Sequence, residues 1–240
     1  MGVEMEGGVE GPGPAMMRLD QAKSRVGLDR DERLVKDGIL RMGSLVETQI
    51  RDSVKALVER DTRLAQAIID GDEQINEAQR EIGELVLMTI ATQSPVARDL
   101  RFLMALDHVA FELERIGDHA SSIAKQVRQL QEAIPLREVA DLARVGYLAA
   151  DQVRGIVTAL IDIDDRLARE VARRDDEIDH GYRMIFAAVI DAMRGDPRFI
   201  DGGTRLILAA HWIERIGDRV TNVAEDVVYL ASGRIEDLNP

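Results

Sequence analysis

The chain contains no cysteine, few aromatic residues and few prolines. Without cysteine it cannot form disulfides, thiolate zinc sites or a cysteine nucleophile, and it suits a reducing compartment. No apolar run approaches the length that spans a bilayer, and no signal peptide is visible, so we expect a cytoplasmic protein. The scarcity of aromatics and prolines, together with much Ala, Leu, Arg, Glu and Asp, favours helix.

The charge is one-sided. The chain has 44 acidic and 31 basic residues, which give a formal net charge of −13. Such a chain repels nucleic acid overall, so nucleic acid is not an expected partner. The same charge suits divalent cations and the basic surfaces of other proteins. The sequence also lacks a P-loop, a nucleophile elbow and the glycine pattern of a dinucleotide-binding fold.

One segment occurs twice. Glu114-Arg115-Ile116-Gly117-Asp118 recurs letter for letter as Glu214-Arg215-Ile216-Gly217-Asp218, one hundred residues later. The similarity extends over residues 113–124 and 213–224, and the upstream segments 49–51 and 61–65 match 152–154 and 164–168. A unit of about one hundred residues is therefore used twice, which points to tandem bundles.

Apolar residues at helical spacing predict three long helices in each unit. The expected helices cover approximately residues 30–60, 62–92 and 96–132, and then 136–163, 167–194 and 201–231. Gln93-Ser94-Pro95 and Gly195-Asp196-Pro197 mark the hairpin turns. The second helix of each unit has a candidate break, at Gly71-Asp72 and near Asp175.

These elements predict an all-α fold of two tandem, pseudo-symmetric, antiparallel three-helix bundles. The first bundle is expected over residues 30–133 and the second over 134–240, and the repeat favours two small cores over one large core. Residues 1–29 are expected to be a disordered tail or residues added ahead of the natural start.

Acidic pairs meet across each predicted hairpin. Glu114 and Asp118 are four residues apart and share one helix face, although like charges there repel. Gly117 between them costs about 1 kcal/mol relative to alanine. The second helix carries a matching pair at equal distance from the turn, so equal rise per residue brings both pairs to one level. The predicted sites contain Asp72, Asn76, Glu114 and Asp118 in the first unit, and Asp175, Asp179, Glu214 and Asp218 in the second.

Carboxylates crowded in this way need a cation. Oxygen ligands without His or Cys suit divalent or trivalent ions such as Mg, Ca, Mn or iron rather than structural zinc. Because the pairs flank the apolar stripe of the third helix, we expect the sites at the surface. The alternative is a solvated acidic face that is paired with arginine and binds no metal.

Several motifs resemble those of the PhoU family, which comprises bacterial and archaeal regulators of phosphate uptake. These motifs are the doubled (L/I)-E-R-I-G-D segment, the D-x-x-I-(D/N) segments, the run Gln93–Arg101 and the closing run Ala224–Leu230. The resemblance covers roughly residues 30–235. It implies two three-helix bundles related by pseudo-symmetry, with E/D-x-x-x-D motifs that hold metal clusters on the bundle surface in some members.

The eight residues of the predicted sites occupy the family's motif positions. Asn76 stands where the family pattern has Asp, so the first site is one charge short and should bind metal more weakly. Ser122 and Asn222, four residues after each motif Asp, are further candidate oxygen ligands.

The resemblance also implies a function. Members of this family repress the phosphate-starvation response, the Pho regulon, by linking the ATPase of a phosphate ABC transporter to a sensor histidine kinase. We therefore expect a helical adaptor and negative regulator with no enzymatic activity. It would reach the membrane through its partners, and the sequence does not decide between a monomer and a homodimer.

Two alternatives stand beside that expectation. One is a metal-dependent phosphoester hydrolase that uses the surface carboxylate clusters to activate water. It lacks a companion base or a phosphate-clamping arginine at a recognisable spacing. The other is a helical scaffold without metal.

Overall fold

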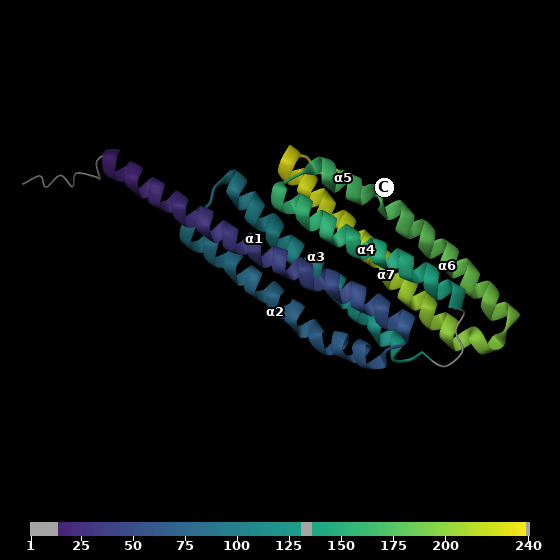
Figure 1. Cartoon of the computed structure of the whole chain (residues 1–240). Helices are drawn as coiled ribbons and strands as arrows, with labels where there is room; N and C mark the ends of the chain where they lie inside the picture. Colours follow the sequence, from purple (N-terminus) through teal and green to yellow (C-terminus); the bar gives the residue numbers. More distant parts are fainter. Residues whose placement is uncertain (1–13, 131–135, 239–240) are drawn as a thin grey trace, which may run out of the picture.

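The computed structural model describes residues 14–130 and 136–238, and within these ranges every regular element is a helix. The elements are α1 (Pro14–Glu59), α2 (Thr62–Gln93), α3 (Ala97–Val127), α4 (Leu136–Asp162), α5 (Asp165–Arg173), α6 (Asp175–Gly195), a short 3-10 helix η1 (Pro197–Phe199) and α7 (Ile200–Ser232). In Figure 1, α2 lies along the outer edge of one bundle, and α5 and α6 lie along the outer edge of the other. The expected pair of three-helix bundles is confirmed.

Helix α1 begins at Pro14, well before the start near residue 30 that the sequence predicted. Residues 14–29, which were expected in a tail, are therefore helical, and residues 1–13 lie outside the described part. Contacts with the bundle hold this end: Leu28 is buried, and Arg25 contacts Asp29 at 2.9 Å and Asp99 of α3 at 2.6 Å. The bundle boundary expected at residues 133–134 also lies outside the described residues.

The two bundles differ in their second helix. Helix α2 continues through Gly71, so the break predicted there is wrong. The break predicted near Asp175 is confirmed, because α5 and α6 meet at Arg174. Three acidic residues, Asp175, Asp176 and Glu177, occupy the first turn of α6. Negative charge there stabilises a helix N-terminus, which favours a new start at this point.

The turn between the first and second helices is the same in both units. Arg60 and Ile163 take left-handed backbone conformations, with φ of 54° and 51°. Asp61 and Asp164 follow them and cap the next helix: Asp61 accepts hydrogen bonds from the amides of residues 63 and 64, and Asp164 from that of residue 167. Such caps stabilise a helix start by about 1 kcal/mol. The repeat therefore extends to backbone conformation.

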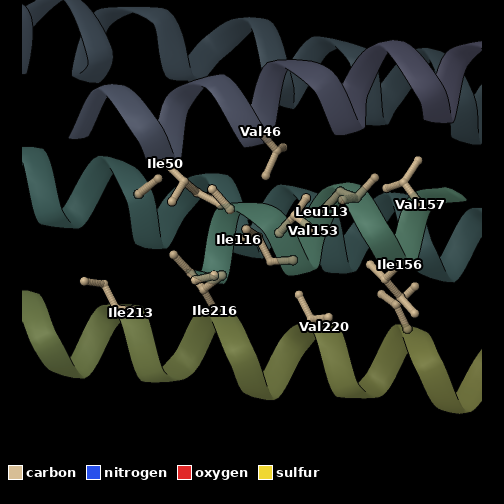
Figure 2. Close-up of a cluster of buried hydrophobic side chains, with 14 of the residues drawn as sticks. Val46, Ile50, Leu113, Ile116, Val153, Ile156, Val157, Ile213, Ile216 and Val220 are labelled. Atoms are coloured by element: carbon tan, nitrogen blue, oxygen red, sulfur yellow. The ribbon is translucent and has the colours of Figure 1, made fainter. Parts of the chain in front are cut away.

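A single hydrophobic core runs through both bundles, where the sequence favoured two small ones. Helices α1 and α3 pack against α4 and α7, and we call this contact the inter-bundle seam. Figure 2 shows its buried aliphatic side chains: Val46, Ile50, Leu113, Ile116, Val153, Ile156, Val157, Ile213, Ile216 and Val220. A shared core removes more apolar surface from water than two separate bundles of this size would.

Two glycines let α1 and α4 approach closely at the seam. A Cβ atom at Gly43 would lie 2.9 Å from Val157 Cγ2, and a Cβ atom at Gly146 would lie still closer to Val54 Cγ2. Gly43 and Gly146 are equivalent positions of the repeat, and so are Val54 and Val157. Each valine therefore packs on the bare backbone of the other bundle.

Helices α3 and α7 cross at the duplicated motif. Arg219 Nη1 lies 3.4 Å from Glu112 Oε2, and at the equivalent pair of positions the ring of His119 stacks on Trp212 with centroids 5.2 Å apart. One contact is ionic and the other aromatic, although both join the same two positions of the repeat. No helix in the described part of the chain is both long and apolar enough to cross a membrane.

Candidate functional site

In the first unit, α2 and α3 bring three of the predicted carboxylates into one region. Burial raises the pKa of Glu114, and the charges of Asp118 and Asp72 raise it further. Burial followed by the charge of Asp72 likewise raises the pKa of Asp118. Asp72, Glu114 and Asp118 therefore lie near enough for their charges to act on one another. Asn76 contributes, after Arg80, to lowering the pKa of Glu73 on its own helix.

Unit two has a more buried cluster, built by α6 and α7. Asp175 is only 5% exposed, and burial, followed by the charges of Asp179, Asp218 and Glu214, raises its pKa to about 7. Burial is also the main cause of the raised pKa values of Glu214 and Asp218, with the charge of Asp179 adding to both. The site was expected at the surface, but its central carboxylate is buried.

The direction of these shifts separates two interpretations of the acidic face. Carboxylates in a solvated, arginine-paired face have lowered pKa values, because a nearby cation favours the charged form. Glu114, Asp118, Asp175, Glu214 and Asp218 all have pKa values shifted upward. Arg115 contacts Glu114 only at 3.8 Å and is 62% exposed. Burial is the largest cause of each upward shift, and neighbouring carboxylates add to it, so these are partly buried acidic clusters and not a fully solvated face.

The glycine of the repeated motif is explained by packing on the second helix of each unit. A Cβ atom at Gly217 would collide with Asp175 Oδ1, and one at Gly117 would lie 3.0 Å from Ile75 Cδ1. Glycine permits close approach at these points, and the tighter packing of the two helices offsets its low helix propensity. In the second unit the glycine admits the Asp175 carboxylate against α7.

A buried glutamine occupies the same position on the first helix of each unit, and the one in the first unit contacts the predicted site, which sequence reasoning missed. Gln49 Nε2 donates a hydrogen bond to Asp72 Oδ1 at 3.0 Å, and the residue is 8% exposed. Its equivalent, Gln152, is 1% exposed and donates to the carbonyl of Val171 at 3.4 Å. A neutral amide adds nothing to a pattern of charges, so the acidic motifs did not point to these residues. The sequence signal that could have found them is their recurrence at equivalent positions of the repeat.

Four buried side-chain oxygens of the cluster residues and the two glutamines have no hydrogen-bond partner within the described residues: Gln49 Oε1, Gln152 Oε1, Asp175 Oδ1 and Glu214 Oε2. A buried acceptor left without a donor costs about 1–3 kcal/mol, and an ionised one more. All four atoms are oxygens, the atom type that hard cations bind, but Arg215 Nε, a buried donor on the residue after Glu214, is also without a hydrogen-bond partner.

The side chains do not form a closed ligand set. Within the described residues, no group of three His, Asp or Glu side chains is placed to hold a metal ion. Asp179 contacts Arg183 at 3.7 Å, and Glu214 contacts His211 at 3.4 Å. Of the further candidate ligands, Asn222 Nδ2 donates to Glu112 across the seam at 3.4 Å, and the carbonyl of Ser122 accepts from Gln126 at 3.4 Å.

Known proteins are similar to this chain over both of its repeated units. The family model described as the PhoU domain matches residues 39–127 and 142–227. The phosphate-specific transport system accessory protein PhoU homolog of Rhizobium meliloti is 37% identical over 206 residues, which cover 85% of this chain and 87% of that protein. Its counterpart in Clostridium acetobutylicum is 36% identical over 202 residues, which cover 84% and 92%.

Two solved structures share the fold. The crystal structure of PhoU from Pseudomonas aeruginosa has a TM-score of 0.82 and 35% identity, and the match covers 86% of this chain and 99% of that one. The phosphate transport system regulatory protein PhoU from Streptococcus pneumoniae has a TM-score of 0.82 and 28% identity, with 88% and 99% covered.

Proposed function

Because the chain belongs to the PhoU family, we propose that it regulates phosphate transport by docking to other proteins and catalyses no reaction. The observation that carries this proposal is the pair of PhoU domains, matched at 39–127 and 142–227, in a chain whose relatives are named accessory proteins of a phosphate-specific transport system.

The finer proposal is an adaptor that links the ATPase of a phosphate ABC transporter to a sensor histidine kinase and represses the Pho regulon. Its support is the resemblance of the motifs together with the acidic surface. A net charge of −13 favours contacts with basic surfaces, and such contacts form faster at low ionic strength. Long helices also present extended faces on which two partners can dock at once.

Deleting the gene is expected to switch on phosphate-starvation genes in phosphate-rich medium, because the link that conveys repression is lost. Transcription of a phosphate-starvation promoter measures this. Re-expression of the full chain from a plasmid should restore repression, and the empty plasmid is the control. An unchanged promoter after deletion contradicts the regulatory assignment.

The second cluster is also proposed as a cation site. The four carboxylates of this cluster, among them the buried Asp175 Oδ1 that accepts no hydrogen bond, fit a hard divalent cation in their chemistry. When bound, such an ion supplies positive charge beside these carboxylates. Asp179, Glu214 and Asp218 are only partly buried, so their side chains retain room to rotate. The first cluster is expected to bind a cation less tightly, because Asn76 replaces one carboxylate.

The melting temperature is therefore expected to rise with added divalent ion, and Asp218→Asn should remove more of that rise than Asp118→Asn. A ligand that binds only the folded state stabilises it by RT ln(1 + [L]/Kd), so the tighter site dominates. Thermal melting with chelator and with Mg, Mn or Ca tests this, and elemental analysis checks the metal content. Equal loss in the two variants, or no response to metal at all, contradicts the assignment.

A metal-dependent phosphoester hydrolase is the second candidate, and one observation favours it. A cavity of about 530 Å³ beside the second cluster contains two arginines, Arg215 and Arg219, although its lining also includes four acidic residues: Asp218, Glu225, Glu236 and Asp237. Guanidinium groups beside carboxylates are a feature of phosphate sites. A phosphatase assay on the metal-loaded protein, with Arg215→Ala as the matched variant, separates this candidate from the regulatory one.

A further inference from the structure

A groove runs along the first bundle between α1 and α2, two helices that lie side by side in Figure 1. It consists of two adjoining cavities of about 530 and 230 Å³, which share Arg41, Leu45 and Gln74. Its lining is mainly apolar, with Leu64 and Ile68 at one end and Ile82 and Leu85 at the other.

The α1 wall of the groove has helical periodicity. Positions 34, 38, 41, 45, 48 and 52 line it, at spacings of three and four residues. This is the pattern by which a helix presents one face to another helix. Two large side chains of the stripe are exposed to solvent, Leu34 at 47% and Leu45 at 39%. Leu34 and Leu45 thus present exposed apolar surface along this wall, beside the polar side chains of Arg41, Thr48 and Asp52.

Gly71 is an independent indication of an occupant. Inside a helix, glycine costs about 1 kcal/mol relative to alanine, and a close neighbour usually accounts for it. Gly43, Gly117 and Gly146 all have such neighbours, but an added Cβ at Gly71 meets nothing within 4 Å beyond its own helix backbone and chain neighbours; Gly195 is equally open, but it is the last residue of α6. Gly71 lines the groove, so the helix leaves bare backbone where an outside segment can approach.

Three charges of the groove lining are acidic and one is basic: Asp52, Glu77 and Glu81 against Arg41. A segment with Lys or Arg along its flanks complements this rim. The α1 wall extends over residues 34–52, which at 1.5 Å per residue is about 27 Å and matches a helix of about 18 residues. The chain's own residues 1–13 are rich in Gly and Glu, so their charge and helix propensity are both unsuitable.

We propose that the α1–α2 groove of the first bundle binds an amphipathic helix of a partner protein, with an apolar face on Leu34, Leu45 and Gly71 and with basic flanks. The inference rests on the proposed docking function for the existence of such a partner. The second bundle carries Arg174 at the position equivalent to Gly71, at the residue where its helix breaks, so the bare backbone belongs to the first bundle alone.

The test uses the full chain and two synthetic helices of 18 residues. One has leucines at helical spacing and lysines along both flanks; the other has the same leucines with glutamates in place of the lysines. Gly71→Leu fills the groove, and Gly195→Leu is the matched control, because Gly195 is the other glycine of the described chain with no atom within 4 Å of an added Cβ. Melting of Gly71→Leu at or above the wild-type temperature shows that the variant is folded.

Fluorescence anisotropy should show that wild type and Gly195→Leu bind the lysine helix alike. Gly71→Leu should bind it about tenfold more weakly or worse, and the glutamate helix should bind wild type weakly. The proposal is overturned if the lysine helix does not bind wild type, or if it binds Gly71→Leu as tightly as wild type.

A parallel pull-down with the transporter ATPase and the kinase keeps the two proposals separate. Loss of one of these partners in Gly71→Leu alone supports the groove. Equal binding of both partners to wild type and Gly71→Leu overturns the groove and leaves the docking function standing. If neither partner binds wild type, the proposed docking function is contradicted. The peptide measurement then decides separately whether the groove binds a helix.

Discussion

Gly146→Leu is expected to destabilise the protein by about 3 kcal/mol or more, because it forces the inter-bundle seam apart. A Cβ at this position already collides with Val54 Cγ2 and lies 3.3 Å from Ile213 Cδ1. Valine has one strongly preferred rotamer in a helix and cannot turn aside. In a chain of this length the melting temperature should fall by roughly 10 °C, as measured by circular dichroism.

Two further variants isolate the cause. Gly71→Leu makes the same change at a helix-interior glycine in open space, so it should not lower the melting temperature. Adding Val54→Ala to Gly146→Leu removes the colliding methyls and should recover part of the loss, as a double-mutant cycle. Wild-type melting of Gly146→Leu would mean that α1 and α4 do not approach as closely as described.

Asp175→Asn is expected to stabilise the metal-free protein at pH 8 and to leave it nearly unchanged at pH 4. The folded state raises the pKa of Asp175 from 3.8 to about 7. Between these two values the unfolded chain has lost the proton while the folded chain keeps it, so stability falls as pH rises from about 4 to about 7 and is then level. Each pKa unit is worth about 1.4 kcal/mol, so the full shift corresponds to about 4 kcal/mol.

Urea unfolding across this pH range, with chelator present, measures the effect. Wild type should lose stability toward pH 7, whereas Asp175→Asn should lose less because asparagine carries no charge. Glu177→Gln is the matched control: it removes an exposed carboxylate of the same helix turn, so its pH profile should follow wild type. A parallel pH dependence in wild type and Asp175→Asn is the result that contradicts the assignment.

The sequence predicted the helices where local signals agree with packing. Pro95 and the Asp196-Pro197 step cannot lie inside a helix, so both hairpin turns fell in the right place. The break predicted at Gly71 does not occur, because a glycine weakens a helix without ending it and the packed residues on both sides keep α2 continuous. The single core was not predictable from periodicity, which shows that a face is apolar but not which helix covers it.

The candidate site was predicted in part for a related reason. Mirror placement about the turn brought Asp72 and Asp118 together, because the rise per residue is fixed. The depth of Asp175 depends on the absence of a side chain at Gly217, a contact between helices that sequence spacing does not express. The ligand role of the eight residues stays a prediction, and the partnerless oxygens of Gln49 and Gln152 add two groups to those that its tests must consider.

The contacts that join α3 to α7 have the form of an isologous interface, in which each patch meets its own counterpart. In a true pair of identical subunits every substitution would appear on both sides at once. Here the two copies are covalently joined, so each can change alone: Glu112 pairs with Arg219, while their counterparts Trp212 and His119 stack. Tandem duplication thus allows one half of the molecule to specialise while the other preserves the contact.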